Sequence, residues 1–232
     1  MEYGLKEGMA TMHGMRNDHK AKNGPETTGA VIHWTSPHDI LVRLMGLGVN
    51  GANSRMIIEK ANIKSGEKVL DVGCGTGDLT LTAKNYAGAS GSAYGIDPSP
   101  EGIDLARKKA ERMSLEAVFE VGLIEKIPYP DATFDVVISR LVIHHLPDDL
   151  KRQGFAEIFR VLRLGGRVFL ADFRPPTNPI LAHLASALVG HRMMMQSNVE
   201  SILPMVSEAG FVNVASGPTR SALLAFVNGK KP

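Results

Sequence analysis

Three glycines spaced two residues apart follow directly on a short run at residues 69–72 that is apolar except for Asp71. They are Gly73, Gly75 and Gly77. The apolar run predicts a buried β-strand, and the residues from Asp78 onward are compatible with a helix. Because glycine has no Cβ atom, it permits positive φ angles and lets a ligand lie against the main chain. The stretch therefore predicts a strand, a tight turn and a helix whose N-terminus faces a bound cofactor.

Two carboxylates around this turn favour a ligand with a positive centre over one with phosphate groups. Asp71 lies inside the predicted strand, where a pyrophosphate would gain nothing from it. Asp78 opens the following helix and competes with a phosphate for the positive end of the helix dipole. Dinucleotide enzymes use a related glycine turn at the same point of a Rossmann-like unit, so a nicotinamide-dependent oxidoreductase is the alternative.

Strand and helix patterns alternate along the rest of the chain. A second strand at 93–97 ends at Asp97, which is placed to accept hydrogen bonds from ribose hydroxyls, and Ser99 with Pro100 predicts the next helix start. Further strands are expected at 117–121, 134–139, 167–173, 211–216 and 222–228, and helices at 40–47, 56–62, 78–87, 101–113, 149–164 and 197–209. This alternation implies a doubly wound parallel sheet.

Two helix ends have sequence signals of their own. The helix at 149–164 is expected to stop at a C-cap formed by Gly165 and Gly166. The helix at 197–209 starts with a capping-box pattern, and Pro204 inside it should kink or split it.

The succession of motifs from residue 68 to residue 173 resembles the class I S-adenosylmethionine-dependent methyltransferases, of the type 11-like kind. His144 and His145, which follow the fourth expected strand, belong to this pattern. The resemblance implies an α/β, Rossmann-like seven-stranded sheet of order 3-2-1-4-5-7-6 with an antiparallel last strand. It also implies that S-adenosyl-L-methionine is the cofactor and that its methyl group passes to an acceptor by direct SN2 displacement, for which the protein mainly aligns the reactants.

The resemblance also assigns roles to residues. The three glycines should lie under the methionine part of the cofactor, Asp71 should meet its ammonium group directly or through water, and Thr76 should assist. Asp97 should bind the ribose diol, and Pro98 should flank the adenine. The thiol of Cys74 is not expected to be a nucleophile, because the turn leaves it little access to an acceptor.

Two further segments complete the expected cofactor site. Many relatives have an acidic residue where this chain has Leu123, so an adenine contact there would come from the main chain or from Glu125. Ser139 and Arg140 should meet the methionine end through their main chain. The expected cofactor-binding residues are therefore Asp71, Gly73, Cys74, Gly75, Thr76, Gly77, Asp97, Pro98, Leu123, Ile124, Glu125, Ser139 and Arg140.

The histidine pair allows two interpretations. A neutral imidazole at His144 or His145 suits removal of a proton from a phenol or a carbon acid near pH 7. The same His-His-Leu segment recurs in superfamily members that act on different acceptors, which favours a role in packing or loop geometry.

The acceptor is expected to be a small, apolar or aromatic molecule, methylated on O, N or C. Residues 73–80 and the lead-in at 41–47 are loosely similar to the ubiquinone and menaquinone C-methyltransferases. Residues 1–38 are expected to be a flexible segment or lid, and residues 39–232 the methyltransferase domain. Trp34 either packs in the core or stacks over the ligand, and the Met-rich stretch 180–195 should help roof the acceptor site. A methyltransferase-like binding protein without activity is a further alternative.

Composition excludes several classes of partner. The formal net charge of +2, without basic runs interleaved with aromatic residues, argues against nucleic acid. One cysteine and the lack of a signal-peptide pattern favour a cytoplasmic protein. The stretch 180–195 is too short and too polar to span a membrane. Met and His residues between positions 12 and 19 fit an unstructured tail better than a metal site, so no metal is expected. A monomer and a homodimer are both compatible with the sequence.

Overall fold

The computed structural model describes residues 24–29, 51–174, 183, 198–221 and 224–232. The expectations for Trp34, for the helix at 40–47, for the Met and His residues between 12 and 19 and for nearly all of the Met-rich stretch 180–195 lie outside these residues.

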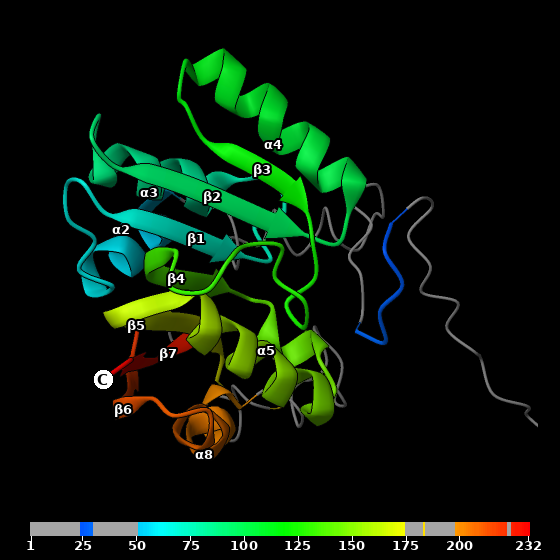
Figure 1. Cartoon of the computed structure of the whole chain (residues 1–232), viewed down its shortest axis with the longest axis vertical. Coiled ribbons are helices and arrows are strands. Elements are labelled where there is room, and N and C mark those ends of the chain that lie inside the picture. The colour runs from blue at the N-terminus through cyan, green and yellow to red at the C-terminus, as the bar shows by residue number, and fades with distance from the viewer. Residues whose placement is uncertain (1–23, 30–50, 175–182, 184–197, 222–223) are drawn as a thin grey trace, which may run out of the picture.

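Seven strands in the described part of the chain form one sheet in the order β3-β2-β1-β4-β5-β7-β6 (Figure 1). The strands are β1 (Lys68–Val72), β2 (Ser92–Asp97), β3 (Val118–Val121), β4 (Phe134–Arg140), β5 (Leu162–Phe173), β6 (Val212–Pro218) and β7 (Leu224–Lys230). β1 to β5 pair in parallel, and β7 runs antiparallel to both β5 and β6. The predicted sheet order and the antiparallel last strand are confirmed.

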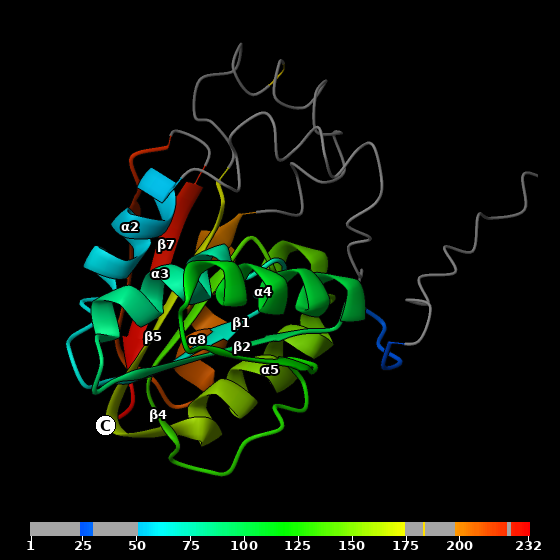
Figure 2. The ribbon, with the colours of Figure 1, turned by 90° about the horizontal axis from the view of Figure 1, so that it is seen from above.

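Helices cover both faces of the sheet (Figure 2). They are α2 (Gly51–Lys60), α3 (Asp78–Ala87), α4 (Pro100–Met113), α5 (Asp148–Val161) and α8 (Leu203–Glu208), with short 3₁₀ turns η1 (Ile143–His145) and η2 (Val199–Ile202). Side chains alternate along a strand, so β1 buries Val69 in the core beneath α2 and α3, and Leu70 and Val72 in the core beneath α5. The strand therefore buries apolar side chains on both faces, as expected for a central parallel strand, and Asp71 is the one buried carboxylate in it.

Two predicted helix starts are confirmed. α3 begins at Asp78, directly after the glycine turn. α4 is capped by Ser99, whose Oγ accepts a hydrogen bond from the backbone N–H of Gly102 at 3.2 Å, and Pro100 occupies the first turn.

The predicted end of the helix at 149–164 is wrong. α5 ends at Val161, and Leu162 already pairs with Phe134 of β4. Leu162 is fully buried in the core, so its side chain is better placed as the first residue of β5 than as a last helical residue. The glycines therefore do not cap a helix; Gly165, with φ of +76°, lies inside β5 where the β4–β5 register shifts.

The C-terminal elements follow the expectations more closely. Pro204 divides the predicted helix into η2 and α8 and sits in the first turn of α8, where its missing N–H is tolerated. The cap of η2 is Asn198, whose side chain accepts from Glu200 N at 3.1 Å. β6 and β7 form the predicted hairpin. Because β1, β2, β4 and β5 are parallel, their carboxyl ends meet at one edge of the sheet, and the candidate site lies there.

Candidate active site

The glycine turn after β1 is held against the end of β2 by its own backbone. Gly73 N and Cys74 N donate to Ile96 O at 2.8 and 3.0 Å, and Gly75 N donates to Asp97 Oδ2 at 2.9 Å. Since these N–H groups are used within the protein, the turn offers a ligand the surface of its main chain at these positions rather than free donors.

Gly73 is the tightest point of the turn. Its φ is +74°, and a Cβ atom placed there would lie 2.2 Å from Cγ2 of Val142, which follows β4. Only glycine fits at this position, and it brings the loop after β4 next to the loop after β1.

Asp71 is a buried carboxylate with one unsatisfied oxygen. Its Oδ2 accepts from Thr80 Oγ1 at 2.7 Å, whereas Oδ1 has no hydrogen-bond partner in the described part of the chain. Burial raises the pKa of Asp71 to about 7; the hydrogen bond from Thr80 and the guanidinium of Arg140 oppose this shift, and Asp97 adds to it. A buried oxygen of this kind calls for a donor, and a ligand ammonium group would supply one.

Ser139 and Arg140 end β4 beside this carboxylate. Ser139 Oγ donates to Val72 O at 2.8 Å, so the hydroxyl is engaged with β1. Arg140 Nη1 donates to Ser54 Oγ of α2 at 2.9 Å. Burial lowers the pKa of Arg140, while the nearby charges of Asp71 and Asp78 oppose that shift. The side chains of both residues therefore pack within the protein, as main-chain contact with a ligand would require.

Thr76 lies in the turn but directs its hydroxyl towards the start of α3 and towards α4. Its Oγ1 donates to Asp78 Oδ2 at 3.1 Å and accepts from Lys109 Nζ at 3.2 Å. Lys109 Nζ is also 2.9 Å from Asp78 Oδ2. These contacts tie α4 to the turn and satisfy Asp78 without a ligand.

Asp97 ends β2 with two of its acceptor positions in use. Oδ2 accepts from Gly75 N and Oδ1 from Ser99 N, each at 2.9 Å. An ionised carboxylate has about four acceptor positions, so each oxygen has capacity left for a diol. Burial raises the pKa of Asp97, and the two backbone donors oppose this. Pro98 is half-buried beside it.

The loop after β3 contributes less than its three predicted residues suggest. Ile124 is buried in the core, where a Cβ atom at Gly154 would lie 2.7 Å from its Cγ1. Its side chain therefore faces α5, and only its main chain is available to a cofactor. Glu125 Oε1 accepts from Thr27 Oγ1 at 2.7 Å. Leu123 forms an isolated bridge with Lys126.

Residues 24–29 cross this edge of the sheet. Besides the bond from Thr27 to Glu125, a Cβ atom at Gly29 would lie 3.0 Å from Leu146 Cδ2 and 3.6 Å from Leu150 Cδ1. The segment therefore joins the loop after β3 to the loop after β4 (blue in Figure 1).

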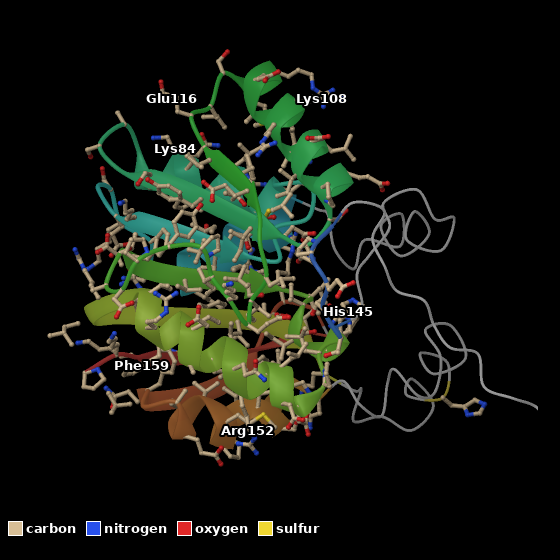
Figure 3. All side chains as sticks on the ribbon, turned by 45° about the vertical axis from the view of Figure 1, so that its right-hand side comes forward. Lys84, Lys108, Glu116, His145, Arg152 and Phe159 are labelled. Carbon is tan, nitrogen blue, oxygen red and sulfur yellow. The ribbon has the colours of Figure 1, made fainter. Side chains whose placement is uncertain are left out.

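The two predicted histidines have different surroundings. His144 Nδ1 lies 2.6 Å from Asp172 Oδ1, and both side chains are almost fully buried. The ring centroids of His144 and His145 are 3.9 Å apart. Burial is the main cause that lowers the pKa of His145 to about 4, and the charge of His144 adds to it. His145 lies at the edge of the molecule where the segment 24–29 also runs (Figure 3).

Asp172 was missed by sequence reasoning, although a signal for it existed. It stands near the end of β5, as Asp71 and Asp97 stand near the ends of β1 and β2. Unlike them, it is followed by neither a glycine turn nor a helix cap, the two sequence features that mark Asp71 and Asp97. The thiol of Cys74 is buried, and burial raises its pKa, so it stays neutral and fits the role expected from the sequence.

The residues at this edge fit S-adenosylmethionine. Oδ1 of Asp71 lacks a donor, Asp97 retains acceptor capacity, and a side chain at Gly73 would collide with Val142. These features suit, in turn, an ammonium group, a diol and a ligand that approaches the main chain. No group of three or more His, Cys, Asp or Glu in the described ranges is arranged to hold a metal. None of the helices described there combines the length and apolar character needed to cross a membrane.

Comparison with known proteins agrees with this site. A family model described as "Methyltransferase domain" matches residues 63–212. The chain is 36% identical over 149 residues to a ubiquinone/menaquinone biosynthesis C-methyltransferase UbiE from Geobacter sp. (strain M21), a match that covers 63% of each protein. It is 30% identical over 195 residues to a demethylmenaquinone methyltransferase from Thermus thermophilus, covering 75% of this chain and 87% of the relative.

Solved structures share the fold. A SAM-dependent methyltransferase from Aquifex aeolicus superposes with a TM-score of 0.63 at 19% identity, covering 84% of this chain and 97% of that one. The [4+2]-cyclase SpnF superposes equally well, with a TM-score of 0.63 at 19% identity over 78% of this chain and 80% of that one. At such identities the superpositions show the fold alone. The family match over residues 63–212, together with the sheet order, establishes that the chain belongs to the methyltransferase-domain family within the class I S-adenosylmethionine-dependent methyltransferases.

Proposed function

We propose that the protein transfers the methyl group of S-adenosylmethionine to a ring carbon of a small, apolar hydroquinone. The observation that carries the proposal is that the family match at 63–212 contains the glycine turn, Asp71, Asp97 and the histidine pair. The acceptor is inferred from the printed names of the relatives. The match to the relative from Geobacter covers 63% of that protein, so its substrate comes to this chain only as our inference.

When bound, the cofactor supplies a methyl group already activated by a positively charged sulfur. The glycine turn carries the methionine portion, Oδ1 of Asp71 receives the ammonium group, and Asp97 receives the ribose diol. A hydroquinone carbon becomes a strong nucleophile when a neighbouring O–H group loses its proton. Once that carbon carries the methyl group, it loses its own hydrogen as a proton, the oxygen regains one, and the aromatic hydroquinone is restored. His144 is the proton acceptor in this proposal, because its imidazole is held in place by a carboxylate, whereas burial lowers the pKa of His145 to about 4.

The alternatives have less support. A nicotinamide dinucleotide would bring its pyrophosphate to a turn flanked by the carboxylates of Asp71 and Asp78, whose charges repel it. The cyclase among the structural neighbours demonstrates that this fold does not by itself fix the reaction. The third alternative, a protein that binds the cofactor without catalysing methyl transfer, is distinguished by the experiment below.

The test is methyl transfer from labelled S-adenosylmethionine to a 2-alkyl-1,4-naphthohydroquinone kept under reducing conditions. We expect label on the unsubstituted quinoid ring carbon of the product. The oxidised naphthoquinone is the matched control, since it has no O–H proton to lose and should not be methylated. Cofactor binding without transfer to this or any other acceptor would favour the binding protein, and turnover of a nicotinamide cofactor would favour the oxidoreductase.

We place the methyltransferase domain at residues 39–232 and a lid at residues 1–38; the contacts of Thr27 and Gly29 across the candidate site support the lid. A cytoplasmic location, the absence of a nucleic-acid partner and a monomeric or homodimeric state are proposed on composition.

Cofactor affinity should rise with pH up to about 7 through ionisation of Asp71. Because its pKa in the ligand-free fold is about 7, the carboxyl is mostly protonated at lower pH. An ammonium group at Oδ1 favours the ionised form, so binding releases a proton, and affinity should increase by up to about tenfold per pH unit below pH 7 and then level off. Calorimetry with S-adenosylhomocysteine in two buffers of different ionisation enthalpy counts the released protons.

The Asp71→Asn variant is the control for this linkage. It keeps the size of the side chain, so it should bind more weakly, release no proton and show little dependence on pH. The same pH slope in parent and variant would contradict the assignment. The raised pKa of Asp71 also makes the stability of the ligand-free protein depend on pH. The contribution of this carboxyl to the free energy of unfolding is fully present below its ordinary pKa of 3.8 and is lost as the pH rises through about 7.

A further inference from the structure

We propose that Asp172 is a positioning residue that holds His144 in the tautomer with the proton on Nδ1, so that Nε2 is the atom that takes the proton from the methyl acceptor. This inference rests on the proposed function for the source of that proton. The orientation of the imidazole stands on the geometry alone.

The carboxylate of Asp172 forms hydrogen bonds with both the ring and the backbone of His144. Oδ1 lies 2.6 Å from Nδ1 of the ring and accepts from Phe173 N at 2.7 Å. Oδ2 accepts from the backbone N–H groups of Ile143 at 2.8 Å and of His144 at 3.2 Å. Three donors from η1 and one from the end of β5 therefore converge on one buried side chain.

These contacts decide which nitrogen carries the proton. Burial raises the pKa of Asp172, but His144 and the backbone donors lower it further, so the net pKa lies below its ordinary value and the group is ionised near neutral pH. An ionised carboxylate can only accept hydrogen bonds, so Nδ1 must be the donor. In a neutral imidazole the other nitrogen, Nε2, is then the acceptor.

The ring has little freedom to turn away from this orientation. It lies 3.9 Å from the ring of His145 and makes an edge contact with Phe173 at 4.7 Å. A small cavity beside the pair is lined in part by Lys151, Asn198 and Ser201, and the ammonium group of Lys151 is bound to Asp148 Oδ1 at 2.8 Å. Because Lys151 pairs with Asp148, the carboxylate of Asp172 bonds only to His144 and to backbone N–H groups among the described residues.

The proton step balances without any further reactant. The O–H bond of the acceptor breaks, its electron pair stays on the oxygen, and the proton bonds to Nε2. His144 becomes an imidazolium whose positive charge faces the carboxylate of Asp172, so the charge formed in the step is met by one already in place.

The variant Asp172→Asn should reverse the tautomer. Two backbone N–H groups point at Oδ2 and one, from Phe173, points at Oδ1, so the asparagine oxygen is expected at Oδ2, where it keeps the larger number of donors. Its NH₂ group then faces Nδ1 of His144. Nδ1 is forced to accept and the proton moves to Nε2, which can no longer act as a base. Nuclear magnetic resonance of the ¹⁵N-histidine-labelled protein reports the tautomer directly, and comparison with His144→Gln assigns the signal among the eight histidines. A parent protein with the proton on Nε2, or an unchanged tautomer in Asp172→Asn, would overturn the proposal.

Kinetics with the 2-alkyl-1,4-naphthohydroquinone separate positioning from general support of the fold. We expect His144→Gln and Asp172→Asn each to lower kcat by about 10²–10⁴-fold with little change in KM for the cofactor. If Asp172 acts through His144, the double variant should be no slower than His144→Gln alone. Additive losses would refute the proposal. Ser201→Ala changes the same cavity without touching His144 and should leave kcat within about twofold of the parent.

The kinetic test and the tautomer measurement can fail independently of each other. If the parent does not methylate the naphthohydroquinone, the proposed acceptor is wrong, and the tautomer measurement still decides whether Asp172 orients His144.

Discussion

Replacing Gly73 by alanine is expected to abolish cofactor binding and to lower the free energy of unfolding by about 2–5 kcal/mol. Positive φ strains any residue with a Cβ atom by about 1–2 kcal/mol, and forcing an extra methyl into a packed site costs about 1–3 kcal/mol more. Here the new Cβ would lie 2.2 Å from Val142 Cγ2, so either the turn or the loop after β4 must move. Chemical denaturation gives the stability, and calorimetry with S-adenosylhomocysteine gives the affinity.

Gly165→Ala separates strain from collision. Gly165 has φ of +76°, close to the +74° of Gly73, but a Cβ atom there meets nothing within 4 Å. It should lose only the strain energy and bind the cofactor normally. Adding Val142→Ala to Gly73→Ala removes both colliding γ carbons and should recover part of the stability. Equal effects of Gly73→Ala and Gly165→Ala would mean that the contact with Val142 is unimportant.

The second large effect is expected for Asp97→Ala, which should weaken cofactor binding by about 10²–10⁴-fold. Two charge-assisted hydrogen bonds to the ribose would be lost, at about 1.5–3 kcal/mol each. The variant also leaves the N–H groups of Gly75 and Ser99 without their acceptor, so the turn itself is disturbed. The measurement is again the calorimetric affinity for S-adenosylhomocysteine.

Two controls separate the ribose contact from the disturbed turn. The 2′,3′-dideoxy form of S-adenosylhomocysteine has no diol, so its loss of affinity on going from the parent to Asp97→Ala measures the disturbed turn alone and should be much smaller than the loss for the intact ligand. Ser99→Ala removes the cap of α4 beside the carboxylate, at a cost to stability of about 1 kcal/mol, and should retain the parent's affinity. If Asp97→Ala binds intact S-adenosylhomocysteine as tightly as the parent, the ribose assignment is wrong.

The fold was largely predictable because its signals are local. The apolar run of β1, the glycines after it and the cap at Ser99 each act within a few residues, and the elements they predict are confirmed. The predicted end of α5 was wrong because two sequence signals competed. Leu162 continues the helical spacing and two glycines follow, yet its burial against Phe134 begins a strand instead.

The candidate site was predictable where a residue's role depends on its own strand end. Asp71 and Asp97 lie near the ends of their strands as expected; Asp71 is buried with one unpaired oxygen, and Asp97 is half-buried with acceptor capacity left. Contacts between distant segments could not be predicted in this way. The bond from Thr27 to Glu125 spans 98 residues, that from Arg140 to Ser54 spans 86, and that from His144 to Asp172 spans 28. Only the folded sheet brings these pairs together.

The hydrogen bonds of the glycine turn to Ile96 and Asp97 have a consequence for the kinetics of ligand entry. Because the amides of Gly73, Cys74 and Gly75 are already bonded in the ligand-free fold, they should be protected from hydrogen exchange before any ligand arrives. The conformational entropy of the turn is therefore lost during folding and not during association. A ligand meets a surface that needs no prior ordering, and its rate of association should be set by access to the edge of the sheet.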